Sequence, residues 1–286
     1  GGTQYGIDKG DTIVTEQELK EIHAYPYKQA FQNDVQSVMA SFSSVNGTKM
    51  HENKPYLTNL LRDEMNFNGF VVGDWNGHAE IPGCTATNCP DAFLAGVDMY
   101  MAPESWKGIY ESLKSQVESG DVPMARLDEA VLRVLRAKVA AGIFEAGLPS
   151  QRPETKKEIL GIAEHRAVAR EAVRKSLVLL KNNNQALPIK PKANVMVVGK
   201  IAKSMKHQTG GWTLSWQGND NANDEFKAGE TIYSGLETAI TQTGGTISWS
   251  PDGSYEIKPD AAIVVFGEDP YAEFHGDRMD LIYEFE

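Results

Sequence analysis

The stretch 69–75, with the sequence GFVVGDW, constrains the fold of this chain more than any other. A short apolar run closed by turn-forming residues is typical of a buried parallel strand. Asp74 is therefore expected at the carboxyl end of a strand, where ligands bind in α/β barrels and in open parallel sheets. A carboxylate there is a candidate nucleophile or base, and Trp75 offers a flat apolar face to a sugar ring. The alternative is an Asp that caps the following helix beside a Trp used for packing.

Helical and strand patterns alternate along residues 1–146, as they do in parallel α/β domains. Thr15 and Glu18 form a capping-box pattern at the start of the first helix. The predicted helices are 15–31, 56–65, 105–119 and 125–141, and the predicted strands are 35–42, 70–73 and 97–101. The fold class expected for this part is α/β.

A second α/β domain is predicted over residues 161–286, after a linker at 147–160 that is polar and contains Pro149 and Pro153. The predicted helices of this domain are 162–175 and 231–241, and the predicted strands are 177–180, 195–199 and 261–266.

The overall composition narrows the functional classes. The chain has 286 residues and a formal net charge of −11, which argues against a nucleic-acid partner and is compatible with a neutral substrate. Its apolar runs are too short for a membrane span, so no membrane partner is expected.

The cysteines, Cys84 and Cys89, are separated by four residues. No His or Cys cluster lies nearby to complete a metal site, and redox-active Cys-X-X-Cys pairs have a shorter spacing. A small disulfide-closed loop is the leading interpretation, and a pair of free thiols is the alternative. A disulfide would indicate a periplasmic or extracellular location.

A second acidic segment, residues 267–278, follows the apolar strand predicted at 261–266. Its carboxylates include Glu268 and Glu273. Two carboxyl groups brought together from separate segments are what glycosidic bond cleavage requires. The alternative is a solvated acidic loop held by Arg278.

Aromatic residues give a third indication. Trp212 and Trp216 lie among Gly and polar residues in the segment 210–218, and exposed indoles stack on pyranose rings while Gln and Asn side chains bind hydroxyls. A buried pair that anchors a loop is the alternative. His51, after a predicted strand, could orient a substrate hydroxyl or cap the next helix.

These segments together resemble glycoside hydrolase family 3, of the β-glucosidase and exo-β-glucanase kind. The signature of its first domain is followed by residues 41–51 (SFSSVNGTKMH), 60–62 (LLR) and 67–75 (FNGFVVGDW). Residues 211–218 (GWTLSWQG) and 267–277 resemble its second domain. The resemblance implies a partial (β/α) TIM-type barrel followed by an α/β sandwich domain, both truncated.

The resemblance also implies roles. Asp74 matches the nucleophile and Glu273 the general acid/base, with Glu268 as the fallback, while Trp75 and Trp216 match indoles that flank the leaving-group sugar. The implied reaction is retaining hydrolysis that releases glucose from the non-reducing ends of β-linked glucosides or oligosaccharides, without a metal or a cofactor. Retention predicts carboxyl groups about 5–5.5 Å apart.

There are departures from the family pattern. The chain starts at the Gly1-Gly2-Thr3 segment, so the sugar-gripping Lys-His pair and Asp that precede it in the family are expected upstream, and Phe42 stands where the family has Tyr. The alternatives are a β-xylosidase or another specificity on the same scaffold, or a carbohydrate-binding relative without catalysis. A single-domain N-acetylglucosaminidase is disfavoured, because its catalytic Asp-Ser-His loop is not visible.

Overall fold

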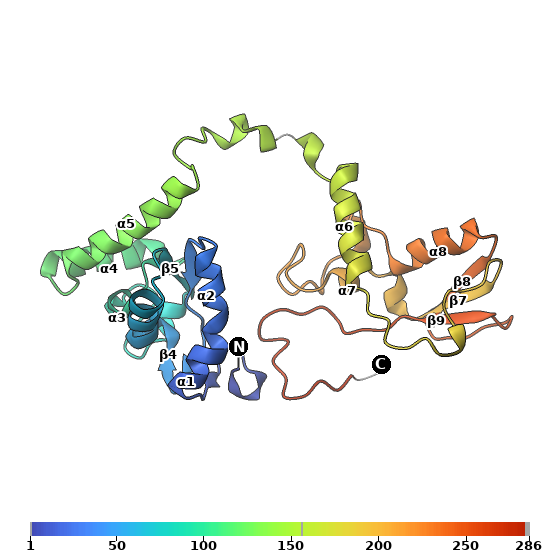
Figure 1. Cartoon of the computed structure of the whole chain (residues 1–286), viewed down its shortest axis with the longest axis horizontal. Helices are drawn as coiled ribbons and strands as arrows, with labels where there is room; N and C mark the ends of the chain where they lie inside the picture. Colours follow the sequence, from blue (N-terminus) through green and yellow to red (C-terminus); the bar gives the residue numbers. More distant parts are fainter. Residues whose placement is uncertain (1, 156, 284–286) are drawn as a thin grey trace. The chain divides into compact units, whose positions relative to one another are not determined.

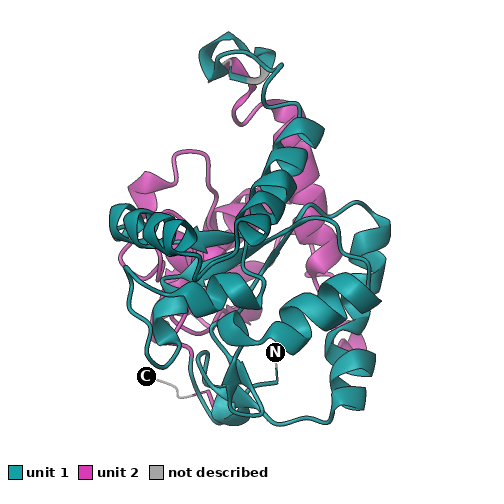
Figure 2. Ribbon diagram, turned by 90° about the vertical axis from the view of Figure 1, so that its left-hand side faces the viewer, with its two compact units in different colours: residues 1–155, 277–280 teal, residues 156–276, 281–286 magenta. Residues whose placement is uncertain are grey.

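The structure, a computed structural model, describes residues 2–155 and 157–283. The chain divides into two compact units, shown in different colours in Figure 2. Unit 1 comprises residues 1–155 and 277–280, and unit 2 comprises residues 156–276 and 281–286. The division falls inside the segment predicted as a linker, and the predicted domain boundaries stay a prediction.

The main sheet of unit 1 is parallel and has the order β2-β5-β6, and its central strand, β5, is labelled in Figure 1. Its strands are β2 (Ser37–Met39), β5 (Phe70–Trp75) and β6 (Met99–Met101). Strands that follow one another along the chain are neighbours in space, which is the order of a singly wound α/β sheet. Within the described residues this sheet is open. The strand predicted from residues 70–73 is confirmed and lies at the centre of the sheet.

Unit 1 also contains a second, smaller sheet. It contains β1 (Asp11–Thr12), β3 (Ser44–Val45) and β4 (Thr48–Lys49) in the order β1-β3-β4. Asn46 and Gly47 connect β3 to the antiparallel β4 with φ values of 49° and 83°. Asn-Gly tolerates positive φ at both positions, which is what a two-residue hairpin requires.

Helices follow the strands of unit 1, and most lie where the pattern predicts them. The capping box at Thr15 and Glu18 is confirmed, and the segment predicted as helical over 15–31 is helical from Glu16 to Gln32 with an interruption at Ala24. The helix passes through a π-helical turn and restarts where Pro26, which lacks an N–H, occupies the first turn. The helical segments are η1 (Gln4–Gly6), α1 (Glu16–Glu18), η2 (Leu19–His23), α2 (Tyr25–Gln32), η3 (Met50–Glu52), η4 (Pro55–Glu64), η5 (Gly77–Glu80), α3 (Pro90–Ala95), α4 (Trp106–Ser119) and α5 (Met124–Ala140).

A buried ion-pair network around Asp98 holds strand β5 at Val71. The Asp98 side chain is fully buried; one of its oxygens accepts a hydrogen bond from the Val71 N–H at 2.8 Å and from the Arg62 guanidinium. The other oxygen accepts from Arg126 Nη2 at 2.8 Å. Because Val71 is itself part of the apolar core, this network fixes β5 between the core and two helices.

Unit 2 has a parallel sheet with the order β8-β7-β9. Its strands are β7 (Asn194–Val198), β8 (Thr246–Ser250) and β9 (Ala261–Val264). The chain adds β8 on one side of β7 and then β9 on the other, which creates a switch point at the carboxyl end of β7. The helical segments are η6 (Pro149–Gln151), η7 (Pro153–Thr155), η8 (Lys157–Ile159), α6 (Ala163–Ser176), η9 (Asn183–Gln185), η10 (Lys200–Lys203), α7 (Met205–Thr209), η11 (Asn223–Glu225) and α8 (Ile232–Gln242), of which η6 and η7 lie before unit 2 begins.

The strand predicted over residues 177–180 is wrong. This apolar run is extended at Leu177, yet within the described chain it forms no strand pairing. Leu177 is 75% exposed and Leu180 is 91% exposed. An apolar run becomes a strand only when another strand lies beside it, and the sequence pattern cannot supply that partner. Within the described residues, no helix combines the length and the apolar composition that a bilayer crossing requires.

Candidate active site

Asp74 lies one residue before the end of β5, at the carboxyl end of the parallel sheet. Its N–H donates a hydrogen bond to Nε2 of His51 at 2.9 Å, and its Oδ1 accepts one from the N–H of Trp75 at 2.7 Å. The following helical turn, η5, has Asn76 as its N-cap, so the alternative that Asp74 caps this helix is wrong. Trp75 is 55% exposed, so an indole face is available next to the carboxylate.

His51 is held directly behind the Asp74 backbone. The ring is only 1% exposed, and burial lowers its pKa to about 4, so the imidazole is neutral at pH 7. Because Nε2 accepts the Asp74 N–H, the proton of the neutral ring is on Nδ1. A Cβ on Gly77 would lie 2.3 Å from the imidazole, so this glycine makes room for the ring. His51 thus positions Asp74, while its contact with a substrate hydroxyl stays a prediction.

Asp8 is a further carboxyl close to Asp74 that the sequence did not single out. Burial raises its pKa, and the nearby carboxylates of Asp277 and Asp74 raise it further. Its Oδ2 is buried and has no hydrogen-bond partner among the described residues. A carboxyl of this kind can donate to or accept from a sugar hydroxyl. The one sequence signal for Asp8 as a site residue is its position in a turn between Gly6 and Gly10.

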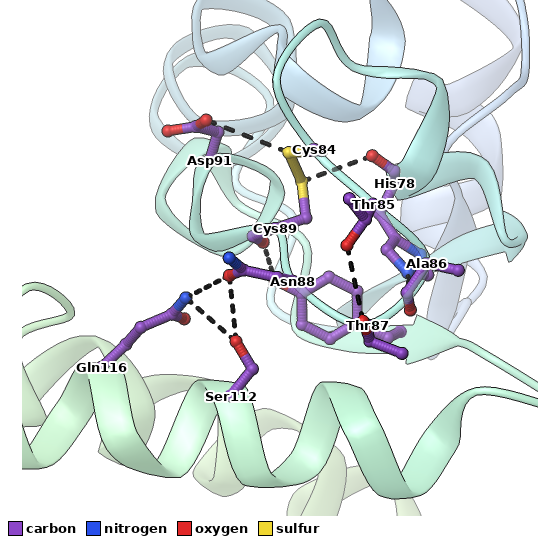
Figure 3. The surroundings of a disulfide bond; sticks show 11 residues. His78, Cys84, Thr85, Ala86, Thr87, Asn88, Cys89, Asp91, Ser112 and Gln116 are labelled. Atoms are coloured by element: carbon purple, nitrogen blue, oxygen red, sulfur yellow. Dashed lines mark hydrogen bonds between the residues drawn. A yellow bond between two sulfur atoms is a disulfide. The ribbon is translucent and has the colours of Figure 1, made fainter.

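The two cysteines form a disulfide in the loop that follows Trp75 (Figure 3). The loop is also docked on α4, because Oδ1 of Asn88 accepts hydrogen bonds from Ser112 at 2.9 Å and from Gln116 at 2.6 Å. The loop between η5 and α3 is therefore fixed both covalently and by hydrogen bonds.

In unit 2, the candidate acid/base residues lie on the loop that follows β9. The side chains of Glu273 and Glu268 are both exposed, and Glu268 accepts a hydrogen bond from the Tyr271 hydroxyl at 3.1 Å. The side-chain amide of Gln217 contacts this loop on both sides of one peptide link: Oε1 accepts from the Ala272 N–H at 2.7 Å, and Nε2 donates to the Glu273 carbonyl at 3.2 Å. The sequence suggested that such an amide would bind sugar hydroxyls, and could not show that its partner is the backbone.

The two indoles of the segment 210–218 are exposed, which excludes the alternative of a buried pair. Trp212 is 68% exposed and Trp216 is 46% exposed, with their ring centroids 6.2 Å apart. Trp216 also packs edge-to-face against Phe274, at 6.1 Å between centroids. An aromatic surface therefore lies next to the loop that carries Glu273.

The predicted residues fall into two groups. Unit 1 brings together Asp74, Trp75 and His51, and unit 2 brings together Glu273, Glu268, Trp212 and Trp216. The distance between the Asp74 and Glu273 carboxyl groups stays a prediction.

A cavity of about 220 Å³ in unit 1 does not belong to this site. Its walls are mostly apolar, with Leu19, Val38 and Leu57 among them, and Asp74 and Trp75 do not line it. Within residues 2–155 and 157–283, no cluster of three or more His, Cys, Asp or Glu side chains is arranged to hold a metal ion.

The α/β fold agrees with comparisons to known proteins. The chain matches the glycosyl hydrolase family 3 N terminal domain over residues 1–137 and the family's C-terminal domain over residues 177–284. It belongs to glycosyl hydrolase family 3.

Among its relatives is the lysosomal beta glucosidase of Dictyostelium discoideum, 32% identical over 86% of this chain and 32% of that protein. The periplasmic beta-glucosidase of Salmonella typhimurium is 32% identical over 84% of this chain and 31% of that protein. Among solved structures, the exo-1,3/1,4-beta-glucanase of a Pseudoalteromonas species is 48% identical, with a TM-score of 0.96, over 100% of this chain and 36% of that chain. The chain thus spans about a third of the length of these proteins.

Proposed function

We propose that this chain carries both catalytic carboxyl groups of a retaining, exo-acting β-glucoside or β-glucan hydrolase that releases glucose from non-reducing ends. Asp74 is assigned as the nucleophile and Glu273 as the general acid/base, with Glu268 as the fallback. Trp75 and Trp216 are assigned to the leaving-group sugar, and Trp212 to substrate binding.

The observation that carries this proposal is the setting of Asp74. A nucleophile must be accessible and must hold one direction. Asp74 is partly exposed at the carboxyl end of β5, and the buried ring of His51 fixes its backbone. The chain's 48% identity to an exo-1,3/1,4-beta-glucanase supports the same reaction class.

In the proposed reaction, the Asp74 carboxylate attacks the anomeric carbon and forms a glycosyl ester while Glu273 gives its proton to the departing oxygen. The Glu273 carboxylate then takes a proton from water while the water oxygen attacks the anomeric carbon. The ester bond to Asp74 breaks, and glucose is released with its original configuration. Both steps use only groups of the chain and water.

The proposal extends to the architecture. We assign β2, β5 and β6 to consecutive strands of a (β/α) TIM-type barrel and β7, β8 and β9 to an α/β sandwich domain. Residues 1–146 and 161–286 are the corresponding parts of the two domains, joined by a linker at 147–160. The two strand orders, one singly wound and one with a switch point, support this division.

We further propose β-linked glucosides or oligosaccharides as substrates and a periplasmic or extracellular location. The names of the exo-glucanase and of the periplasmic relative support these assignments, and so does the disulfide.

The test is to trap the covalent intermediate. The whole protein, as it is produced, is treated with 2,4-dinitrophenyl 2-deoxy-2-fluoro-β-glucoside and digested, and the label is located by mass spectrometry. The label is expected on Asp74. Asp74→Ala should lower kcat/KM for an aryl β-glucoside by about 10⁴-fold, because the nucleophile is lost. The exposed Asp63 gives the matched control, and Asp63→Ala should leave turnover unchanged.

The same experiment separates the alternatives. A label on another carboxylate, or full turnover by Asp74→Ala, would show that the nucleophile is assigned wrongly. Faster turnover of an aryl β-xyloside would indicate a β-xylosidase. Sugar binding without any turnover would indicate a carbohydrate-binding relative.

A further inference from the structure

The Gln217 side-chain amide holds the part of the loop that carries Glu273. Gln217 accepts the Ala272 N–H at 2.7 Å and donates to the Glu273 carbonyl at 3.2 Å. A primary amide that uses its oxygen and its nitrogen on one peptide segment defines the orientation of that segment, as a neighbouring strand would. The two peptide groups that flank the Ala272–Glu273 pair, one before Ala272 and one after Glu273, are therefore tied to the segment 210–218.

One close backbone approach strengthens this attachment. A Cβ on Gly211 would lie 2.1 Å from the carbonyl oxygen of Tyr271, so only glycine fits at this position and the loop lies directly against the segment 210–218. Within the loop, a Cβ on Gly276 would lie 2.5 Å from the Tyr271 ring, so the loop is also closely packed on itself.

The residue after Glu273 adopts an unfavourable backbone conformation. Phe274 has φ of 71°, a region that bulky residues rarely occupy. Such a conformation persists only where the surroundings hold it, and such conformations cluster at functional sites. Its ring packs on Trp216, which is the neighbour of Gln217 in sequence. The support thus acts on both sides of Glu273.

We propose that Gln217 is a positioning residue for the general acid/base: its amide holds the peptide groups on both sides of the Ala272–Glu273 pair and so sets the direction in which the Glu273 carboxyl leaves the loop. This inference rests on the proposed function. It differs from the sugar-binding use that the sequence suggested for such an amide.

The proposed role of Gln217 predicts that the loss of kcat/KM depends on the leaving group, because a general acid speeds cleavage only when the leaving group needs a proton. Loss of protonation slows cleavage of a poor leaving group by about 10²–10⁴-fold. A dinitrophenolate, which leaves without a proton, is little affected. Disturbed folding or weakened sugar binding would instead slow both substrates alike.

The experiment compares methyl β-glucoside with 2,4-dinitrophenyl β-glucoside on the whole protein, and reads kcat/KM from single-exponential progress at low substrate concentration. Gln217→Ala should lose about 10–100-fold on the methyl glucoside and less than about 3-fold on the dinitrophenyl glucoside. Gln217→Glu keeps the acceptor for the Ala272 N–H and loses the donor, so it should fall between wild type and Gln217→Ala.

The chain offers a matched control in Gln208. Its Oε1 accepts the Ile232 N–H at 2.8 Å and its Nε2 donates to the Glu230 carbonyl at 3.0 Å, which is the same paired contact on another loop of unit 2. Gln208→Ala should therefore cost comparable stability without any dependence on the leaving group.

Glu273→Ala is the reference for the proposed function. If it shows no dependence on the leaving group, the acid/base assignment fails and the inference fails with it. If Glu273→Ala instead loses much more activity on the methyl glucoside than on the dinitrophenyl glucoside, the proposed function stands. If Gln217→Ala then slows hydrolysis of both glucosides equally, or slows neither, the positioning role of Gln217 is refuted.

Discussion

At the scale of single residues, His51 shows how burial converts a titratable group into a fixed support. The ring accepts the Asp74 N–H only while Nε2 is unprotonated. Burial disfavours the charged imidazolium, with the nearby charge of His78 adding to the effect, so the ring stays neutral down to about pH 4. His51 thus acts as a buried, neutral hydrogen-bond acceptor for the Asp74 N–H.

This burial predicts a pH dependence of stability. The pKa of His51 falls from 6.5 in the unfolded chain to about 4 in the fold, so the unfolded chain alone binds the proton between these values. The free energy of unfolding should therefore fall as the pH falls from 6.5 to 4, by up to about 3 kcal/mol. His51→Gln keeps an acceptor for Asp74 but does not titrate, and should lack this part of the slope.

Urea unfolding between about pH 4 and about pH 7.5 measures the effect. His165→Gln, at an exposed position on α6, is the control and should follow the wild type. Equal slopes for wild type and His51→Gln would mean that His51 does not carry this linkage.

At the scale of elements, β5 depends on the buried charge of Asp98. Its side chain is inaccessible to solvent, and it pairs with Arg62 and Arg126 while it accepts the Val71 N–H. A buried ion pair adds little net stability, but removing one partner leaves the other charge buried and uncompensated. The network therefore acts mainly by fixing the position of β5, the strand that contains Asp74.

Asp98→Ala should lower the free energy of unfolding by about 3–5 kcal/mol, because it removes the buried carboxylate that pairs with the guanidinium groups of Arg62 and Arg126. Asp98→Asn keeps an acceptor for the Val71 N–H and should cost less. Asp128→Ala, an exposed change on α5, should stay within about 0.5 kcal/mol of wild type. Urea denaturation gives all three values, and a small loss for Asp98→Ala would contradict the anchoring role.

The elements also show how far the sequence pattern reaches. Helix α5 and strand β5 were predicted because their apolar residues repeat with a clear period or end at clear turn signals. Strand β8 has the sequence TISWS and was missed, because its polar, half-exposed residues give a weak apolar signal. The opposite error at residues 177–180 has the same cause: pairing depends on residues far away in the chain.

The site residues likewise divide into those that a local sequence pattern predicts and those that depend on contacts with distant residues. The position of Asp74 could be predicted because a strand and its end are local features. The burial of His51 depends on the room left by Gly77, and the role of Gln217 depends on a loop 55 residues away. Such contacts are products of the tertiary structure.

At the scale of the whole molecule, the segment 143–160 connects two units that each have their own parallel sheet. Its regular structure consists of short 3₁₀ turns, and most of its described residues are exposed. Exposed connections with few packed contacts are the preferred sites of proteolysis.

Limited trypsin digestion should therefore cut first within residues 143–160, and yield fragments that correspond to the two units. Mass spectrometry of the early products identifies the site. A first cut at Lys181, or in the acidic loop 267–278, would instead place the most accessible segment inside unit 2.

The disulfide between Cys84 and Cys89 has a practical consequence for anyone who produces this protein. It closes the loop 84–89, which follows β5 and η5 in the chain, and cytosolic reductants keep such cysteines as free thiols. The choice of expression host therefore determines the covalent state of the active-site surroundings, and material from a reducing cytoplasm should be reoxidised before its specific activity is compared with that of secreted material.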